Sequence, residues 1–454
     1  MQTTGRKLTE GPVGRHLVDM TAPVLLGIMT MMGQALVDAW FLGRVGDRAL
    51  AAQAFSYPII LIVTSVAIGL GAGTSSVVAR AIGKGDHRRA KRLATDSLLL
   101  SFLITAVVAL LGVLTIRPLF RLLGVPEDMI PLIRSFMIIL YAGVPFIVVG
   151  MVGMSSMRAT GDTRLPSKLM ILGSLLNVAL DPVLIFGVGP IPALGLNGAA
   201  FAALLARSSI LVGALLLLRG RLDMVSFKRP DPAELRQSWK DILHVGLPAA
   251  GTNAIVPLGT MLITAMIARF GPDAVAGFGV ASRIESMMLV IYYAMSAIIG
   301  PFVGQNFSAG EEERILRALR LCTAFCLASG LTIAAVLAVA SNFLPGLFSD
   351  DPNVTTVTRT YLCIAPVGYG TYGMVMVMNA TFNALGRPLP AVAISVGRML
   401  VLYVPLAAVG MVFFAAPGMF VAYAVANIVA GFAAFAWAMR TVRVSCSEEL
   451  VVGI

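Results

Sequence analysis

The chain has little charge, little cysteine and little histidine. Only 13% of its 454 residues are charged, and it contains four Cys, three His and three Trp. Charge this scarce lies outside the range of soluble domains, in which about a quarter of residues are charged. Cys322 and Cys326 lie a helical turn apart with no Cys or His partner motif, which makes a poor metal site. HExxH, P-loop and prenyl-diphosphate DxxxD motifs are also missing, so we expect neither an enzyme nor a cofactor.

Long apolar stretches are what the chain has in abundance. Its hydrophobic fraction is 58% and its mean hydropathy is +0.88. A helix needs about 20 apolar residues to cross a hydrocarbon core of roughly 30 Å. The stretches lack strand alternation and are too long for barrel strands, so we predict an all-α, polytopic membrane protein. Twelve spans are predicted, near 17–42, 52–79, 95–116, 130–157, 167–187, 198–218, 243–268, 274–303, 316–341, 356–383, 389–413 and 418–440.

Basic residues are concentrated in alternate loops. The formal net charge is +11, and Lys and Arg crowd the loops after the second, fourth and sixth predicted spans. Cytoplasmic loops of membrane proteins carry such an excess, so we expect both termini to be cytoplasmic in the inner (plasma) membrane. The charge distribution is therefore explained by topology and membrane lipid, and we expect no nucleic-acid partner.

The sequence matches itself when it is shifted by 225 positions. Pro23 then falls on Pro248, Gly46 on Gly271 and Gly143 on Gly368. Backbone geometry constrains Pro and Gly more than other residues, and internal repeats of this size are typical of secondary transporters. We expect an N-terminal lobe of six helices (1–218), a polar cytoplasmic linker (219–241), a C-terminal lobe of six helices (242–440) and a cytoplasmic tail (441–454).

Two acids interrupt the apolar spans of the first half. Asp38 lies about four residues before a polar turn, and Asp181 lies about 14 residues into a span that enters from the cytoplasm, or about 21 Å up. Both acids are thus predicted at the same outer-half depth. Gln34 and Asn177 precede them by four residues and share their helix faces. Buried acids in membrane helices are candidate functional residues. The four side chains could hold a proton or a hard cation, or they could form a polar network that only fastens two helices.

Several motifs resemble the multidrug and toxic compound extrusion (MATE) family. They are LVDAWFLGRVG from position 36, ARAIGKGD at 79–86, MRATGDTRLP at 157–166, LNVALDPVLIFG from 176, and the second-half echoes GQNFSAGE and NALGRP. The resemblance spans nearly the whole chain. It implies two six-helix bundles around a V-shaped cavity and the export of organic cations and other drugs in exchange for H⁺ or Na⁺. We expect a monomer that acts on small molecules.

The resemblance also favours one branch of that family. The NorM-like branch carries acids at places that here hold Val256 and Met374, whereas Asp38, Asn177 and Asp181 match the DinF-like pattern. In that branch Pro23 corresponds to a hinge, and Tyr141 is a candidate fourth member of the ion site. A threonine implicated in Na⁺ binding is replaced by Ala203. This replacement favours H⁺ over Na⁺ as the coupling ion.

The second half contains one deep acid of its own. Glu285 lies about eleven residues into its predicted span, near the midplane, and could attract a cationic drug. It could equally be the salt partner of a deep arginine, either Arg283, Arg207 or Arg398. Tyr292 and Tyr293 could line an adaptable substrate site because aromatic faces accept cations and varied shapes.

One alternative function stays open at this point. A lipid-linked oligosaccharide flippase of the same superfamily would share the helical architecture. Such proteins usually place several cationic residues centrally to hold a diphosphate, and the three deep arginines leave room for that. Protection of cells against cationic dyes would favour the drug exporter over the flippase.

Overall fold

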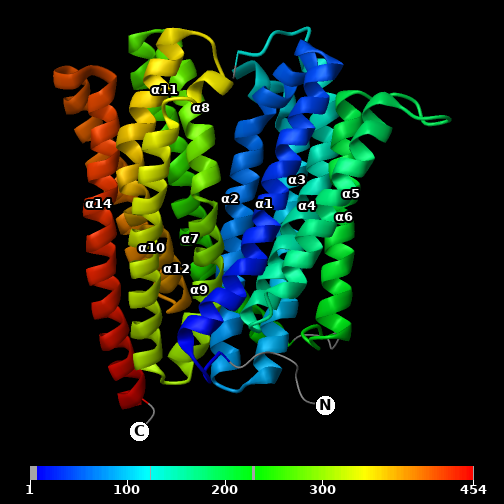
Figure 1. Cartoon of the computed structure of the whole chain (residues 1–454). Coiled ribbons are helices and arrows are strands. Elements are labelled where there is room, and N and C mark those ends of the chain that lie inside the picture. The colour runs from blue at the N-terminus through cyan, green and yellow to red at the C-terminus, as the bar shows by residue number, and fades with distance from the viewer. Residues whose placement is uncertain (1–7, 123, 227–230, 453–454) are drawn as a thin grey trace. The chain divides into compact units, whose positions relative to one another are not determined.

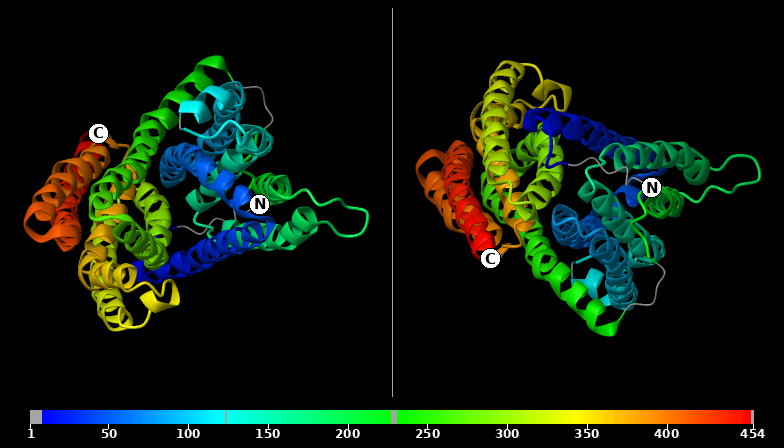
Figure 2. Two further views of the ribbon diagram at one scale, coloured as in Figure 1. Left: turned by 90° about the horizontal axis from the view of Figure 1, so that it is seen from above. Right: turned by 90° about the horizontal axis from the view of Figure 1, so that it is seen from below.

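The computed structural model describes residues 8–122, 124–226 and 231–452. Within these ranges the regular structure is helical apart from a single isolated bridge between Val188 and Ile191, and short turns and loops join the helices. In Figures 1 and 2 the helices of each half run side by side. The predicted all-α class is confirmed. The helices are α1 (Val13–Val45), α2 (Asp47–Gly83), α3 (His87–Leu122), α4 (Ile130–Ala159), α5 (Arg164–Phe186), α6 (Leu196–Gly220), α7 (Pro232–Ile267), α8 (Pro272–Met288), α9 (Val290–Ser308), α10 (Glu312–Ala340), α11 (Pro352–Ile364), α12 (Tyr369–Ala384), α13 (Leu389–Val396) and α14 (Val404–Val452).

Three predicted spans are built from more than one helix. The pair α8 and α9 is bent by 43° at a short break, and α11 joins α12 through a 3-10 turn at Ala365–Gly368. A π-helical stretch, Gly397–Tyr403, links α13 to α14. Conversely, α14 is two spans, because Ala415 has a non-helical φ of 52° just before Pro417. The close approach of Gly410 and Gly418 lets the chain reverse there, since a Cβ at Gly418 would lie 2.1 Å from the Gly410 oxygen.

The backbone divides into two compact units, and the described chain passes from one unit to the other at two places. Unit 1 contains Ala22–Ala250, and unit 2 contains Leu8–Thr21 and the residues from Gly251 onward. The crossings fall inside α1 and inside α7, next to the repeat-related prolines Pro23 and Pro248. The start of each of these helices therefore packs in one unit and the rest in the other.

Glycines explain why the start of α7 belongs to unit 1. Gly69 and Gly73 lie four residues apart on α2, and an added Cβ on either would lie within 2.6 Å of the α7 backbone near Ile242–Ala250. Small residues at this spacing let two membrane helices come into backbone contact. Asp231 and Pro232 start α7, because the Asp231 carboxylate accepts the backbone N–H of Ala233 and Pro occupies the first helical position. Residues 232–241 of the predicted linker are therefore helical, and so is the predicted tail as far as Val452.

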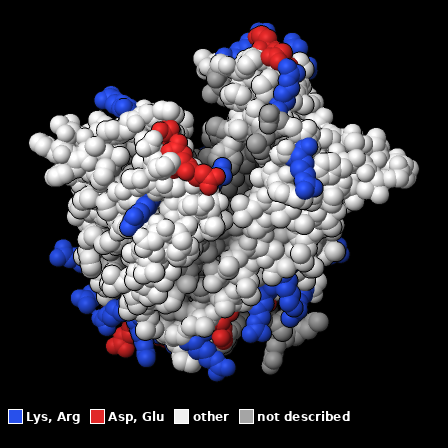
Figure 3. Space-filling model, turned by 45° about the horizontal axis from the view of Figure 1, so that its top comes forward, with Lys and Arg blue, Asp and Glu red and all other residues white. Residues whose placement is uncertain are grey.

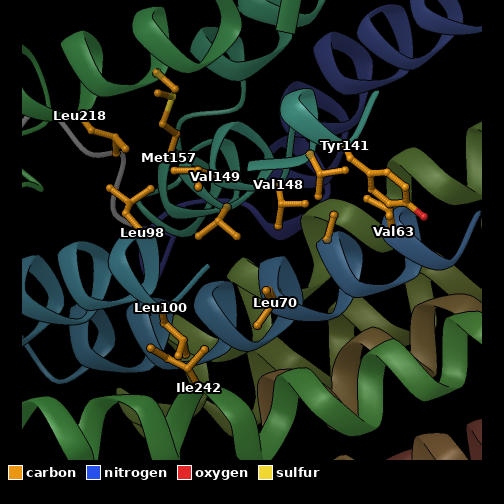
Figure 4. Packing of buried hydrophobic residues seen from close by; sticks show 14 of the residues in the cluster. Val63, Leu70, Leu98, Leu100, Tyr141, Val148, Val149, Met157, Leu218 and Ile242 are labelled. Atoms are coloured by element: carbon orange, nitrogen blue, oxygen red, sulfur yellow. The ribbon is translucent and has the colours of Figure 1, made fainter. Parts of the chain in front are cut away.

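The core of unit 1 is apolar and lies among α2, α3, α4 and α6. Figure 4 shows Val63, Leu70, Val148 and Val149 pointing toward one another in this cluster. Large apolar side chains are also exposed on the outside of both units, for example Leu114, Leu216 and Phe413. Figure 3 shows a mainly uncharged face with most charged side chains near its two ends. This distribution fits helices that face lipid.

Candidate functional site

The predicted acid pair is brought together in unit 1. Asp38 comes from α1 and Asp181 from α5, and the two carboxyl groups are near enough to interact electrostatically. Gln34 joins the two helices, because its Nε2 donates to Asp38 Oδ2 at 3.3 Å and also to Asn177 Oδ1. Asn177 and Asp181 are each only 1% exposed. The helical spacing of four residues therefore assembles all four predicted side chains at one place.

This cluster keeps polar atoms without protein partners. Asp38 Oδ1, Asp181 Oδ2 and Asn177 Nδ2 are buried and have no hydrogen-bond partner among the described residues. Unsatisfied buried polar atoms cost free energy, and a purely structural fastening would be expected to pair them. The pair therefore has the chemistry of a site that takes up and releases a small cation.

Arg207 of α6 is a charged neighbour that the sequence did not reveal. Its guanidinium acts electrostatically on the Asp38 carboxylate. From the sequence alone, Arg207 is only one of three candidate salt partners of Glu285. The structure places Arg207 in unit 1 and Glu285 in unit 2.

Among the described residues, Tyr141 forms no hydrogen bond with Asp38 or Asp181. It is buried in the apolar core, and its ring lies against Gly112 of α3, where an added Cβ would be 2.2 Å from the ring. Figure 4 shows it beside Val63. Its membership of the ion site, inferred only from the family resemblance, stays a prediction.

Pro23 lies at the point where α1 passes from unit 2 to unit 1. Just beyond it, Ile28 and Met31 pack on a small cluster of Met154, Met170 and Ile210. Methionine is flexible and fits changing surroundings. These features are compatible with the predicted hinge, since Pro removes one helix hydrogen bond and a soft neighbour tolerates a bend.

Glu285 forms a second polar cluster, within unit 2. Tyr361 of α11 donates to its Oε2, and Tyr423 of α14 donates to its Oε1 at 2.5 Å. Of the three candidate arginines, Arg398 is the one that acts electrostatically on Glu285. Arg398 Nη1 donates to Asn427 Oδ1 at 2.9 Å, and its guanidinium lies 4.4 Å from the centre of the Tyr372 ring. The two tyrosine donors were not predicted, because their positions near Glu285 depend on long-range packing of three helices.

The two predicted tyrosines of α9 have different surroundings. Tyr293 is 43% exposed and interacts with Glu285 and Tyr372. Tyr292 is fully buried, and its hydroxyl lies 3.1 Å from Ser329 Oγ on α10. Its ring lies against Gly373. Tyr292 therefore packs between helices, and its place in the substrate site stays a prediction that the structure gives no contact to support.

Comparison with known families identifies the architecture. The MatE family model matches residues 23–183 and again residues 248–409. The two matches begin at Pro23 and Pro248, in the register of the internal repeat. Together they cover well over half of the chain.

Known relatives match over nearly the whole length. A protein of Shewanella oneidensis named FAD transporter is 39% identical over 95% of this chain and 96% of its own. A probable multidrug resistance protein NorM of Thermotoga maritima is 26% identical over 84% and 82% of the two chains. The crystal structure of the Vibrio cholerae MATE transporter VcmN in the bent form is 32% identical and superimposes with a TM-score of 0.90 over 95% and 98% of the chains. The chain is therefore an integral membrane transporter that belongs to the MatE family, the MATE transporters that its motifs resemble.

Proposed function

We propose that this transporter is an antiporter that exports drugs and related aromatic molecules in exchange for protons taken up at Asp38 and Asp181. The observation that carries the proposal is the clustering of the two interacting carboxyl groups around Gln34 and Asn177 in the interior of unit 1. A proton fits between two carboxyl oxygens without any further ligand. The chain would lie in the inner membrane as a monomer, with both termini cytoplasmic, as the basic loops indicate.

The charges around the pair favour a proton over Na⁺. The charged groups that face the pair are Arg207 of α6 and the two acids themselves. One shared proton makes this group neutral, which lowers the cost of burial in a medium of low dielectric constant. A Na⁺ ion would need several oxygen ligands, yet Asn177 Oδ1 already accepts from Gln34 and Ala203 offers no hydroxyl.

Coupling would use the two helices that pass between the units. Proton release or uptake changes the hydrogen bonds that join α1 to α5. Because α1 is held in both units, a bend near Pro23 would transmit that change to unit 2. Exchange requires the proton and the substrate to favour different conformations, since a ligand shifts an equilibrium only by its differential affinity.

FAD is a second candidate substrate. The relative that is 39% identical over nearly the full length is named FAD transporter, whereas the multidrug relatives are more distant. The tyrosine-rich cluster around Glu285 suits planar aromatic rings. The flippase alternative stays a prediction.

The test is export by the purified protein in proteoliposomes. ΔpH and a Na⁺ gradient are imposed separately, and ethidium, FAD and a lipid-linked diphosphate are offered in parallel. We expect export in Na⁺-free buffer that a protonophore abolishes. Export that requires Na⁺ and survives the protonophore would contradict proton coupling, and movement of the diphosphate lipid alone would support the flippase.

A further inference from the structure

Unit 2 contains two buried N–H groups that have no acceptor. Arg398 is only 4% exposed and Asn427 is fully buried. Arg398 Nη1 and Asn427 Oδ1 are bonded to each other, but Arg398 Nε and Asn427 Nδ2 have no partner among the described residues. A buried donor without an acceptor is costly, most of all on a charged group. These two donors lie on one bonded pair of side chains, so a ligand with acceptor oxygens could satisfy both.

The carboxylate of Glu285, in the same cluster, already accepts hydrogen bonds from two donors. Glu285 accepts a phenol hydroxyl on each of its two oxygens and is balanced by the charge of Arg398. A cation would have to displace these donors before it could bind the carboxylate closely. The groups that still lack partners therefore favour an acceptor over a cation.

Aromatic rings surround this charged pair. Tyr361 and Tyr423 bond Glu285, the Tyr403 ring centre lies 5.2 Å from that of Tyr423, and Arg398 lies over Tyr372. Tyr293 interacts with the same charges and is substantially exposed, so the cluster reaches the surface of unit 2 at that residue. Tyrosine rings bind planar aromatic molecules through their faces and edges.

The backbone at Arg398 is itself unusual. Residues Gly397–Tyr403 form a π-helix, and the stretch includes both Arg398 and Tyr403. π-Helical stretches are rare and occur frequently at functional sites. This local geometry is independent of the hydrogen-bond argument and points to the same residues.

We infer that the cluster of Glu285, Arg398, Asn427 and their tyrosines binds a planar aromatic molecule that carries a negatively charged oxygen. The oxygen would accept from Arg398 Nε and Asn427 Nδ2, and the rings would hold the aromatic part. This inference deepens the proposed export function by giving the substrate a charge, and it rests on that function. It also reverses the preference for cations that Glu285 alone suggested.

Two dyes with the same ring framework and opposite charge provide the test. Binding of fluorescein, an anion, and rhodamine 6G, a cation, is measured by fluorescence anisotropy with the full chain in detergent. We expect tighter binding of fluorescein. Arg398→Gln should weaken fluorescein binding about tenfold to hundredfold, as expected for a hydrogen bond to a charged group. It should not weaken rhodamine 6G binding, because it removes only a positive charge near Glu285. Arg283→Gln removes the same charge from the exposed face of α8 and should change neither dye.

A second variant distinguishes loss of the binding site from loss of folding. Asn427→Asp keeps a partner for Arg398 and places a negative charge where the ligand oxygen is expected, so fluorescein binding should be lost while the protein stays monodisperse. The inference is overturned if fluorescein binding is indifferent to Arg398→Gln and Asn427→Asp, or if rhodamine 6G binds more tightly and depends on Glu285. Proton-driven export measured with the same protein separates the two proposals, because a failure of ΔpH drive with the dye preference intact contradicts proton coupling alone.

Discussion

The two units share a backbone plan but not a chemistry. Asp38 and Asp181 of unit 1 have Ile263 and Leu406 as their repeat mates, while Glu285 and Tyr361 of unit 2 correspond to Ile60 and Phe136. Each unit therefore has a polar cluster at positions that are apolar in the other. The repeat preserves the helices and the proline pair Pro23 and Pro248, whereas the buried charged residues differ between the two halves.

This difference is the basis for proposing separate tasks for the two units. The cluster of unit 1 is two interacting acids with one nearby cation, which suits exchange of a proton. The cluster of unit 2 is one acid with two phenol donors, a buried arginine and aromatic rings, which suits an aromatic ligand. A symmetric scaffold allows this division because the crossing helices α1 and α7 connect the units in two equivalent places.

The largest expected effect comes from neutralising the acids of unit 1. Asp38→Asn and Asp181→Asn should each abolish ΔpH-driven export, because an amide has nearly the same shape but cannot exchange a proton. Export is measured in proteoliposomes at equal protein content. Asp19→Asn, on the same helix and outside the cluster, is the matched control and should keep transport. Transport at the wild-type rate by either mutant would place proton coupling elsewhere.

A transplanted acid tests whether the units are interchangeable. Ile263 is 1% exposed and lies four residues before the end of α7. Ile263→Asp should destabilise unit 2 by up to about 2.5–3.5 kcal/mol, the insertion cost of an aspartate at the centre of a membrane helix. It should also fail to restore export to Asp38→Asn, because no second acid faces it from position 406. Thermal unfolding and export measure the two effects. Rescue by the double mutant would show that the position alone, and not the cluster, makes the site.

The architecture and half of the site were predictable from local sequence. The apolar spans, the repeat and the four-residue spacing of Gln34 with Asp38 and Asn177 with Asp181 are short-range patterns, and they predicted the class and the polar faces. Arg207 beside Asp38, and Tyr423 beside Glu285, depend on how distant helices pack, which no single-sequence pattern carries. The break at Ala415 falls between the predicted spans 389–413 and 418–440. The π-helix at Gly397–Tyr403 was not predicted, because no local sequence pattern marks it.

Two repeat-related arginines give a smaller test of the comparison. Arg314 donates to the backbone oxygens of Leu8, Glu10 and Gly11, whereas Arg89 donates to Ser238 and pairs with Glu234 and Asp241. Each arginine binds residues at the N-terminal end of a helix, α1 or α7, that passes from one unit to the other. We expect Arg314→Ala and Arg89→Ala each to destabilise by about 1–2 kcal/mol, in line with charge-assisted hydrogen bonds at partly exposed sites. In about 1 M salt the effect of Arg89→Ala should shrink, because salt screens carboxylate pairs more than backbone bonds. Melting temperatures at low and high salt measure this, and equal salt dependence would contradict the assignment.

The smallest effect is expected at the tyrosine donors of Glu285. Tyr423→Phe removes one hydrogen bond to a carboxylate that keeps its second donor from Tyr361. We expect the apparent KM for an exported aromatic substrate to change about threefold to tenfold, as expected for about 1 kcal/mol. The ion dependence should not change, since unit 1 keeps its acids. Tyr57→Phe is the matched control, because Tyr57 is 58% exposed and lies in unit 1. If Tyr423→Phe instead uncouples export from ΔpH while leaving KM unchanged, the division of tasks between the units is wrong, and proton exchange extends to Glu285.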